Sequence, residues 1–248
     1  MAKDRFTSQA EAYAKFRPAY PAAMMEYIVS FCNTKEKAWD CATGNGQAAA
    51  LLSPYFKKVY ATDISKTQIK NAVQKDNIEY SISPAENTLF DAGSFDLITV
   101  AQAYHWLNWE LFRQEVLRVA RPGAVIAVWM YNLPVFADSG IDQLLLDFYK
   151  NTVGPYWDAE RKYVEANYST VEFNYEEIPS SAFAINLAWS REHFLGYLSS
   201  WSATKNFEKA NSYSPLHKIE TALKTLWNED EIKTVQFPII LKLGRILK

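Results

Sequence analysis

The chain has 248 residues, of which 49% are hydrophobic, and is long enough for one large domain or a domain with a cap. Its formal net charge of -2 and the absence of a long basic run argue against RNA or DNA as the main partner. Two cysteines, an N-terminal segment without a signal-peptide apolar core, and no apolar run of membrane-spanning length argue against a disulfide-rich secreted protein and a membrane partner. We therefore expect a cytoplasmic protein.

The first half of the chain alternates helices and strands. Apolar periodicity and turn signals predict helices over 7–16, 21–32, 47–55, 65–75 and 109–120, and strands over 37–41, 59–62, 78–83, 95–100 and 124–130. The strand over 95–100 is nearly all apolar, as buried parallel strands are. Because the elements alternate with short connections, we predict an α/β fold with a doubly wound, mostly parallel sheet.

The alternation stops after residue 130. Helices are predicted over 138–152, 159–168, 191–200 and 216–227, the segment 182–189 is mostly apolar, and 235–247 is expected to form a strand pair or hairpin arm with Pro238 at an edge or bulge. Aromatic residues crowd between Trp129 and Trp201, as the core of a helical subdomain or as the wall of a substrate pocket.

These patterns suggest four regions along the chain. We expect an N-terminal helical lid (1–34), a cofactor-binding core (35–131), a helical, aromatic-rich cap that holds the substrate (132–230), and C-terminal strands that complete the sheet (231–248).

The most informative motif lies between Asp40 and Ala49, where a strand ends in an acid and a Gly44-x-Gly46 turn leads into an Ala-rich helix. Such a turn lets backbone N–H groups approach a nucleotide-like cofactor. With Asp63 following 19 residues after Gly44, it fits a dinucleotide site and a nicotinamide-dependent oxidoreductase. Asp40 favours a cofactor that carries an amino-acid group instead, and a plain loop is the third interpretation.

Four distinctive segments each follow a predicted strand: 40–46, Asp63, 85–86 and 101–106. Right-handed crossovers place the carboxyl ends of parallel strands at one edge of the sheet, where ligands bind in such folds. We therefore expect these four segments to form one site.

The ordered set of motifs resembles the class I S-adenosylmethionine (SAM) methyltransferases, within them the small-molecule group that includes trans-aconitate methyltransferase and its relatives. The matching residues are Tyr13-x-x-x-Arg17-Pro18-x-Tyr20-Pro21, Asp40–Gln47, Asp63, Pro84-Ala85-Glu86, Ala101–Trp106 and Arg118–Gly123. Ala42 stands where these enzymes have a glycine. The resemblance implies a Rossmann-like sheet of seven strands, SAM as the cofactor and S-adenosylhomocysteine as the product.

The resemblance also implies the residues that bind the cofactor. They are Tyr13, Arg17, Tyr20, Asp40, Ala42, Thr43, Gly44, Gly46, Gln47, Asp63, Ile64, Ala85, Glu86 and Ala101. Asp63 would hold the ribose diol, Ala85 and Glu86 the adenine, and the Ala101 carbonyl the methionine ammonium. Arg17, with Tyr13 and Tyr20 above the cofactor, would face the methionine carboxylate.

The acceptor side of the site carries fewer signals. His105 and Trp106 are the candidate catalytic pair, although a single histidine is more often structural, and Trp106 or Tyr104 could stabilise the sulfonium by cation–π contact. Tyr104, Trp129, Tyr131 and Trp201 are the candidate substrate residues, and Arg161 and Arg191 are possible anion partners. No Cys/His cluster predicts a metal.

Because the sequence offers no secure general base, we hypothesise O-methylation of a small carboxylate, which is already ionised at neutral pH. The alternatives are a nicotinamide-dependent oxidoreductase, a SAM-binding sensor or partner protein without transfer activity, and, among methyltransferases, quinone C-methylation or RNA methylation. No oligomeric state follows from the sequence.

Overall fold

A computed structural model describes residues 16–247, and the structural statements below concern that part of the chain. The predicted helix over 7–16 lies almost wholly outside it. The described strands are β1 (Lys37–Cys41), β2 (Lys58–Asp63), β3 (Ile78–Ile82), β4 (Phe95–Ala101), β5 (Ala120–Tyr131), β6 (Glu176–Ile178), β7 (Phe183–Trp189) and β8 (Lys233–Arg245). The described helices are α2 (Ala22–Ser30), α3 (Gln47–Leu52), α4 (Lys66–Lys70), α5 (Trp109–Val119), α6 (Ser139–Asp147), α7 (Arg161–Glu165), α8 (Arg191–Ser199), α9 (Ser202–Asn211) and α10 (Leu216–Leu226).

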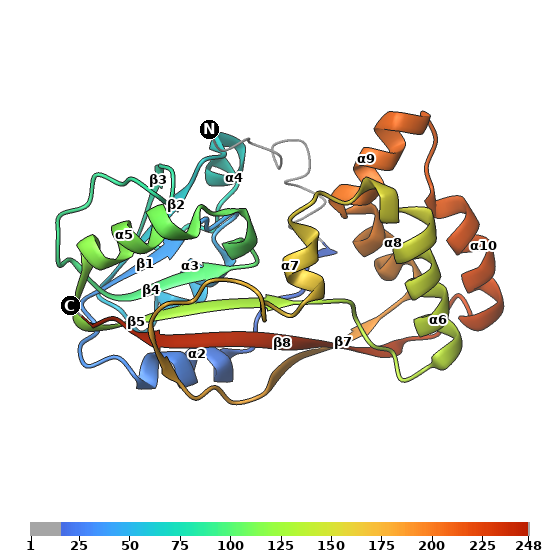
Figure 1. Ribbon diagram of the computed structural model, residues 1–248. Coiled ribbons are helices and arrows are strands. Elements are labelled where there is room, and N and C mark those ends of the chain that lie inside the picture. The colour runs from blue at the N-terminus through green and yellow to red at the C-terminus, as the bar shows by residue number, and fades with distance from the viewer. Residues whose placement is uncertain (1–15, 248) are drawn as a thin grey trace.

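All the described strands belong to one sheet, in the order β3-β2-β1-β4-β5-β8-β6, with β7 paired to another stretch of β8 (Figure 1). The first five strands are parallel, and β8 joins β5 in the antiparallel direction. The predicted α/β fold with a mostly parallel sheet is confirmed. The sheet has eight strands where we expected seven, because the region expected as a helical cap also supplies β6 and β7.

The sheet buries both faces, which explains its apolar strands. Along β5, Val125, Ala127 and Trp129 pack in one apolar cluster with α2 and α3, and the intervening residues Ile126 and Val128 pack in a second cluster with α5. This alternation follows from the period of two in a strand. The carboxyl ends of the parallel strands are left for loops, and the four segments expected to form the site lie there.

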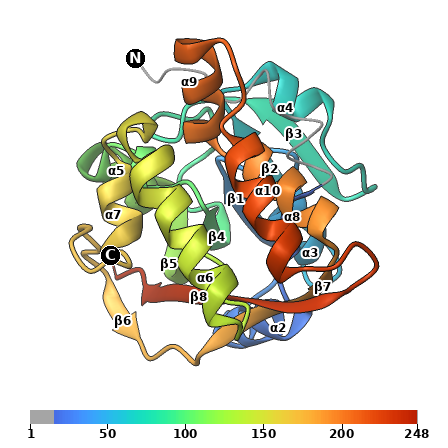
Figure 2. The same ribbon diagram turned by 90° about the vertical axis from the view of Figure 1, so that its right-hand side faces the viewer.

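The helices after β5 gather at one end of the molecule. Figure 2 looks onto α6, α8, α9 and α10, which lie together in both views of the ribbon. Phe194 stacks on Trp227 and both contact Phe136, so part of the aromatic crowd is the core of this cap. Trp157 and Trp201, by contrast, line a pocket. The crowded aromatic residues therefore form in part a core between these helices and in part the wall of a pocket.

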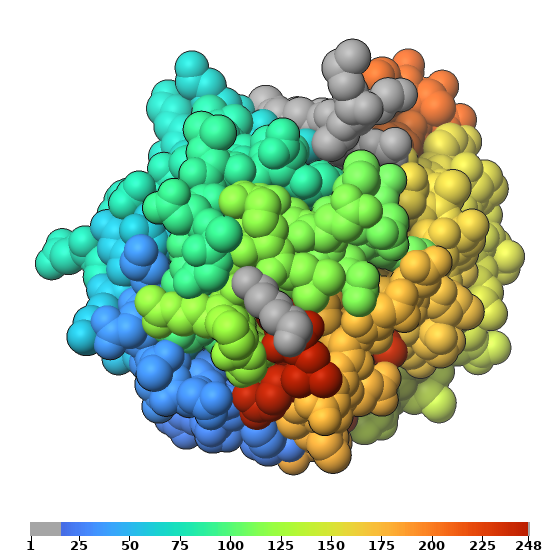
Figure 3. Space-filling view, turned by 60° about the vertical axis from the view of Figure 1, so that its left-hand side comes forward, coloured from blue at the N-terminus to red at the C-terminus, as the bar shows by residue number. Residues whose placement is uncertain are grey.

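The C-terminal segment is one long strand and not the strand pair or hairpin arm that we expected. β8 pairs with β5 and β6 through its second half and with β7 through its first half. In Figure 3 its red C-terminal end lies at the surface beside the gold segment that carries β6. Pro238 pairs with Ala184 of β7, just before the β5 pairing begins at Ile239, so its missing N–H interrupts no bond to β5.

Several helices are shorter than predicted, and two differences have a clear physical reason. α4 ends at Lys70 and not at 75, because the Val73 N–H donates to the Asn45 carbonyl instead of continuing the helix. α9 was not predicted at all; its polar stretch offers only a short apolar stripe, with Ala203 and Phe207 buried.

Candidate active site

A left-handed turn follows β1 directly. Ala42, Gly44 and Gly46 have φ angles of 52°, 57° and 80°. A Cβ at Gly46 would overlap the Tyr80 hydroxyl, so this position needs glycine for space as well as for its backbone conformation. Ala42 adopts the same conformation with a methyl group, at a cost of about 1 kcal/mol. The turn leaves its backbone accessible to a ligand on the pocket side.

Asp40 supports this turn from inside the protein. Its carboxylate is fully buried and accepts hydrogen bonds from the Thr43 and Thr99 hydroxyl groups and from the Ala49 N–H. Burial raises the pKa of Asp40 to about 6, although these hydrogen bonds act to lower it. Asp40 and Gly46, which we expected to bind the cofactor, are absent from the pocket lining and shape the turn from behind.

Asp63 ends β2 beside the same turn. Its Oδ2 accepts the Gly44 N–H at 2.9 Å, and its Oδ1 accepts the Ser65 N–H at 2.8 Å. A carboxylate oxygen has acceptor capacity for more than one hydrogen bond. Asp63 lines the pocket, so each oxygen is oriented by the backbone and can still receive a ligand hydroxyl.

A pocket of about 400 Å³ opens at the carboxyl ends of β1, β2 and β4, and its size suits a ligand of cofactor dimensions. Ten of the predicted cofactor residues line it: Tyr20, Ala42, Thr43, Gly44, Gln47, Asp63, Ile64, Ala85, Glu86 and Ala101. Their roles stay predictions. Tyr13 lies outside the described residues, and Arg17 lines the neighbouring pocket instead.

The far wall of this pocket comes from the loop after β3 and the end of β4. Ala85 is buried, and Glu86 Oε1 accepts the Asn108 N–H at 3.0 Å. Gln102, which follows β4 with a φ of 56°, donates its N–H to the Trp129 carbonyl at 2.9 Å. Strain of this kind is typical of functional sites.

Gln68 and Glu160 also line the pocket and were not predicted. The Gln68 Oε1 atom is buried and has no hydrogen-bond partner among the described residues. A buried acceptor of this kind calls for a donor from a ligand, so the pocket fits a cofactor with N–H or O–H groups. The Ser65-x-x-Gln68 spacing of a capping box was the available signal, because it puts Gln68 in the first turn of α4 beside Asp63.

A second, smaller pocket of about 90 Å³ adjoins the first, and Gln102 and Trp106 line both. Its other lining residues are Arg17, His105, Tyr131, Asn132, Trp157, Asp158, Arg161, Tyr197, Trp201 and Ser202. We call the first the cofactor pocket and the second the acceptor pocket. Tyr131 and Trp201, two of the candidate substrate residues, thus line the acceptor pocket, and their role stays a prediction. Trp157 and Tyr197 come from the same crowded aromatic stretch, whereas Asp158 and Ser202 were not indicated by the sequence.

Arg161 is held in a fixed position at the acceptor pocket. Its Nε donates to the Tyr149 hydroxyl at 2.7 Å, and its Nη2 donates to Asn132 Oδ1 at 3.3 Å. Its guanidinium lies over the Trp157 ring, 4.5 Å from the centroid. Arg191, the other predicted anion partner, donates to the Trp227 carbonyl at 2.7 Å and does not line the pocket.

His105 also lines the acceptor pocket, with its Nδ1 atom 2.7 Å from the Tyr168 hydroxyl. Burial lowers the pKa of His105 to about 3, and the positive charge of Arg161 acts in the same direction. The imidazole is therefore neutral near pH 7 and a weak proton acceptor. This geometry favours a shaping role for His105 over the role of general base.

Two predicted substrate residues lie beneath the pockets. Tyr104 is 1% exposed, and its hydroxyl donates to the Glu172 carbonyl at 2.6 Å. Trp129 is fully buried and packs edge-on against Tyr20, with ring centroids 5.4 Å apart. Other side chains cover both rings, so neither ring reaches the pockets. They pack behind the residues that form the pocket walls. The sequence could not distinguish such support from contact with a substrate.

Within residues 16–247 no group of three or more His, Cys, Asp or Glu side chains is arranged to hold a metal ion. Similarly, none of the helices in this part of the chain combines the length and apolar character needed to cross a membrane.

Comparison with known proteins identifies the family. Residues 39–128 match the model of a methyltransferase domain. A Dictyostelium discoideum protein named as a methyltransferase is 35% identical over 249 residues, which cover 98% of this chain and 95% of that protein. A Saccharomyces cerevisiae protein named as an S-adenosylmethionine-dependent methyltransferase is 30% identical over 172 residues, covering 66% of this chain and 58% of that protein. A solved structure described as a type II methyltransferase from Anaeromyxobacter dehalogenans has a TM-score of 0.86 at 35% identity, covering 94% of this chain and 99% of that one.

These similarities do not favour the nicotinamide-dependent oxidoreductase or the non-catalytic SAM-binding protein, and they do not single out the trans-aconitate group. The chain is an enzyme whose cofactor is SAM. It belongs to the class I SAM-dependent methyltransferases.

Proposed function

We propose that this enzyme transfers the methyl group of SAM to a carboxylate oxygen of a small acid. The observation that carries the proposal is Arg161, whose guanidinium lines the acceptor pocket and is fixed by Tyr149, Asn132 and the Trp157 ring. A guanidinium presents a planar set of donors that matches a carboxylate. Arg17 lines the same pocket and adds a second positive charge.

Three parts of SAM can be assigned to residues of the cofactor pocket. We assign the ribose diol to Asp63, the adenine to Ala85 and Glu86, and the ammonium group to the Ala101 carbonyl, all of which line that pocket. The junction of the two pockets, between Gln102 and Trp106, is then the place of transfer. Trp106 can stabilise positive charge there through its ring face.

When bound, SAM supplies an electrophilic methyl group on a sulfonium sulfur. The protein has to position the acceptor, exclude water and hold the acceptor's charge. An ionised carboxylate needs no base, which agrees with a pKa of about 3 for His105, the one histidine among the described lining residues. The aromatic walls formed by Tyr131, Trp157 and Trp201 leave room for a small, flat molecule.

The direct test uses methyl-labelled SAM with a panel of small mono-, di- and tricarboxylic acids and a metabolite extract. Label that mild base releases as methanol identifies a carboxyl ester and supports the proposal. Base-stable label in a purified product contradicts it and points to N-, C- or ether O-methylation, including quinones, and label in RNA would point to a nucleic-acid acceptor.

The Arg161 assignment has its own test. Arg161→Gln should raise the KM for the acid about 10- to 100-fold, because a charged hydrogen-bond partner is worth about 1.5–3 kcal/mol. The Kd of S-adenosylhomocysteine should stay the same. Arg191→Gln is the matched control and should leave both constants unchanged. Equal effects of the two variants on KM would remove Arg161 from the acceptor site.

A further inference from the structure

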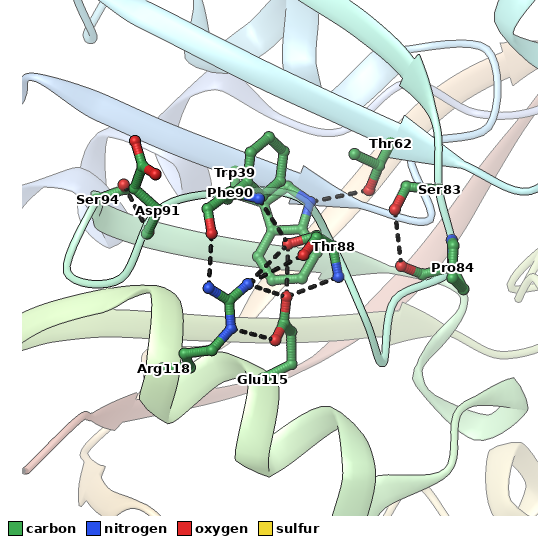
Figure 4. Close-up of polar contacts among 10 residues, drawn as sticks. All are labelled: Trp39, Thr62, Ser83, Pro84, Thr88, Phe90, Asp91, Ser94, Glu115 and Arg118. Atoms are coloured by element: carbon green, nitrogen blue, oxygen red, sulfur yellow. Dashed lines mark hydrogen bonds and ion pairs between the residues drawn. The ribbon is translucent and has the colours of Figure 1, made fainter.

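A polar network outside both pockets fixes the loop between β3 and β4 (residues 83–94), which carries Ala85 and Glu86 (Figure 4). At its centre is Glu115 on α5, which is buried in spite of its charge. Glu115 Oε1 accepts the Thr88 N–H at 2.8 Å and also accepts the Thr88 hydroxyl. A buried carboxylate needs such partners, and here the loop supplies two of them.

Arg118, one turn further along α5, completes the network. Its Nε donates to Glu115 Oε2 at 2.8 Å, and its Nη2 donates to Glu115 Oε1 at 2.7 Å. The same guanidinium donates to the Phe90 carbonyl at 2.6 Å and to the Thr88 carbonyl at 3.1 Å. Burial raises the pKa of Glu115, but the hydrogen bonds from Arg118 and Thr88 outweigh it and leave the pKa lowered, so the pair is ionised.

The same helix holds both ends of the loop. At its N-terminus the Asn108 N–H donates to Glu86 Oε1 at 3.0 Å, and near its C-terminus the Arg118 carbonyl accepts the Gly93 N–H at 3.0 Å. Phe90 is packed edge-on against Trp39, with ring centroids 5.7 Å apart, in the apolar cluster that α5 shares with the sheet. Contacts with α5 therefore set the path of this loop, which contributes Ser83, Ala85 and Glu86 to the cofactor pocket, although no residue of α5 lines that pocket.

We propose that Glu115 and Arg118 are positioning residues that set the selectivity of the cofactor pocket for its base. They act through Thr88 and Phe90, and they hold Ala85 and Glu86 where the edge of an adenine can be recognised. The inference rests on the assignment of Ala85 and Glu86 to the adenine made above. No residue of the Arg118–Gly123 motif lines either pocket, and the proposal explains what Arg118 contributes to the site.

The experiment compares two ligands that differ at the base: S-adenosylhomocysteine and S-inosylhomocysteine, in which hypoxanthine replaces adenine. Their Kd values are measured by calorimetry on the full-length protein and on Arg118→Lys and Glu115→Gln. We expect adenine binding to weaken about 10-fold and hypoxanthine binding to weaken much less, because misplacing one hydrogen-bonding group costs roughly that factor. The KM for the methyl acceptor should not change.

Arg113→Lys is the matched control. Arg113 lies on the same helix and donates to the Asn174 carbonyl at 3.3 Å, away from the loop, so the ratio of the two Kd values should stay at its original value. A fall in thermal stability with an unchanged ratio in Arg118→Lys and Glu115→Gln would mean a purely structural role and would overturn the proposal. If Arg118→Lys does not fold, Glu115→Gln decides, because it keeps the shape of the side chain.

Glu86→Gln separates this inference from the assignment on which it rests. If Glu86→Gln changes the ratio and the two α5 variants do not, the adenine assignment holds and the positioning proposal is wrong. If none of the three changes the ratio, the base is recognised elsewhere and both fail. A changed ratio of the two Kd values in both α5 variants supports the positioning proposal. If Glu86→Gln then leaves the ratio unchanged, Ala85 is the residue that contacts the base.

Discussion

The cofactor pocket and the acceptor pocket meet at Gln102 and Trp106 but are built in different ways. The cofactor pocket takes most of its residues from the turns after β1, β2 and β4, between positions 42 and 107. The acceptor pocket joins Arg17, the end of β5, the segment 157–161 and the segment 197–202. One pocket is thus a property of a local strand-and-turn pattern, and the other exists only after distant segments have packed. We therefore expect that substitutions on the acceptor side leave cofactor binding unchanged.

The largest effect is expected from Asp63→Ala, which tests whether the two pockets are separable. Losing two hydrogen bonds to a charged group should weaken binding of S-adenosylhomocysteine by about 2–4 kcal/mol, measured by calorimetry. The acceptor KM, measured at saturating SAM, should hardly move. Asp76→Ala, at an exposed position, is the control. Unchanged cofactor affinity would show that Asp63 does not hold the ribose.

The contribution of Asp40, which supports the turn of the cofactor pocket, to the free energy of unfolding should depend on pH. Burial raises the pKa of Asp40 from 3.8 to about 6, so the folded protein binds a proton more tightly than the unfolded chain does. The resulting stabilisation is fully present below about pH 4 and is lost as the pH rises through 6. Relative to Asp40→Asn, the free energy of unfolding of the wild type should fall by about 3 kcal/mol between pH 3 and 8, at 1.36 kcal/mol per pKa unit.

Urea denaturation at several pH values measures this difference, and Asp76→Asn serves as the reference for a surface carboxylate. Parallel stability curves for the wild type and Asp40→Asn would mean that Asp40 titrates normally. That result would remove the buried, protonated support that we expect behind the turn of the cofactor pocket.

A smaller effect is expected from Glu160→Gln. This variant tests whether the cofactor pocket carries a negative charge where the acceptor pocket carries a positive one. Glu160 lines the cofactor pocket, and the next residue, Arg161, lines the acceptor pocket. SAM carries one more positive charge than S-adenosylhomocysteine, so loss of the carboxylate should weaken SAM binding by about 1 kcal/mol more than product binding. Glu110→Gln, outside both pockets, should leave the ratio of the two Kd values unchanged. An unchanged ratio in Glu160→Gln would place its charge away from the sulfonium.

The smallest effect is expected from Ala42→Gly. Relief of the left-handed conformation, partly offset by the entropy of glycine, should stabilise the protein by about 0.5 kcal/mol in thermal unfolding. Ala137→Gly is a close control, because Ala137 has a φ of 54° and lies outside both pockets. Both variants should be stabilised, and only Ala42→Gly should alter the Kd of SAM. Equal Kd values would show that the Ala42 methyl group does not narrow the pocket.

The difference between the pockets also explains what could be predicted from the sequence. The Gly44–Gly46 turn and Asp63 follow strands whose apolar runs are readable, and the rules for parallel sheets bring such segments together. The role of Asp40 behind the turn was missed, because sequence position does not tell which side of a loop a carboxylate faces. Gln68 was missed because a capping box explains its presence without a ligand.

On the acceptor side, prediction depended on residue type, which is a weaker signal. Arg161 and Arg191 are equivalent in the sequence, and only the packing of the cap turns one of them into the pocket. Arg17 was expected at the cofactor and lies at the acceptor pocket, because its guanidinium donates to the Ser200 carbonyl and lies over the Tyr197 ring. The β6 and β7 strands were missed for a similar reason, since their partner β8 comes much later in the chain.

The single strand β8 has a consequence for how the molecule is made. It pairs with β5, β6 and β7, and it follows all three in the chain. During synthesis the sheet edge at β5 and both later strands therefore wait, unpaired, until residues 233–245 have left the ribosome. Unpaired edges of this kind are prone to aggregate, and pairings between distant segments form slowly. The nascent sheet is thus exposed to aggregation at three strand edges until β8 has formed.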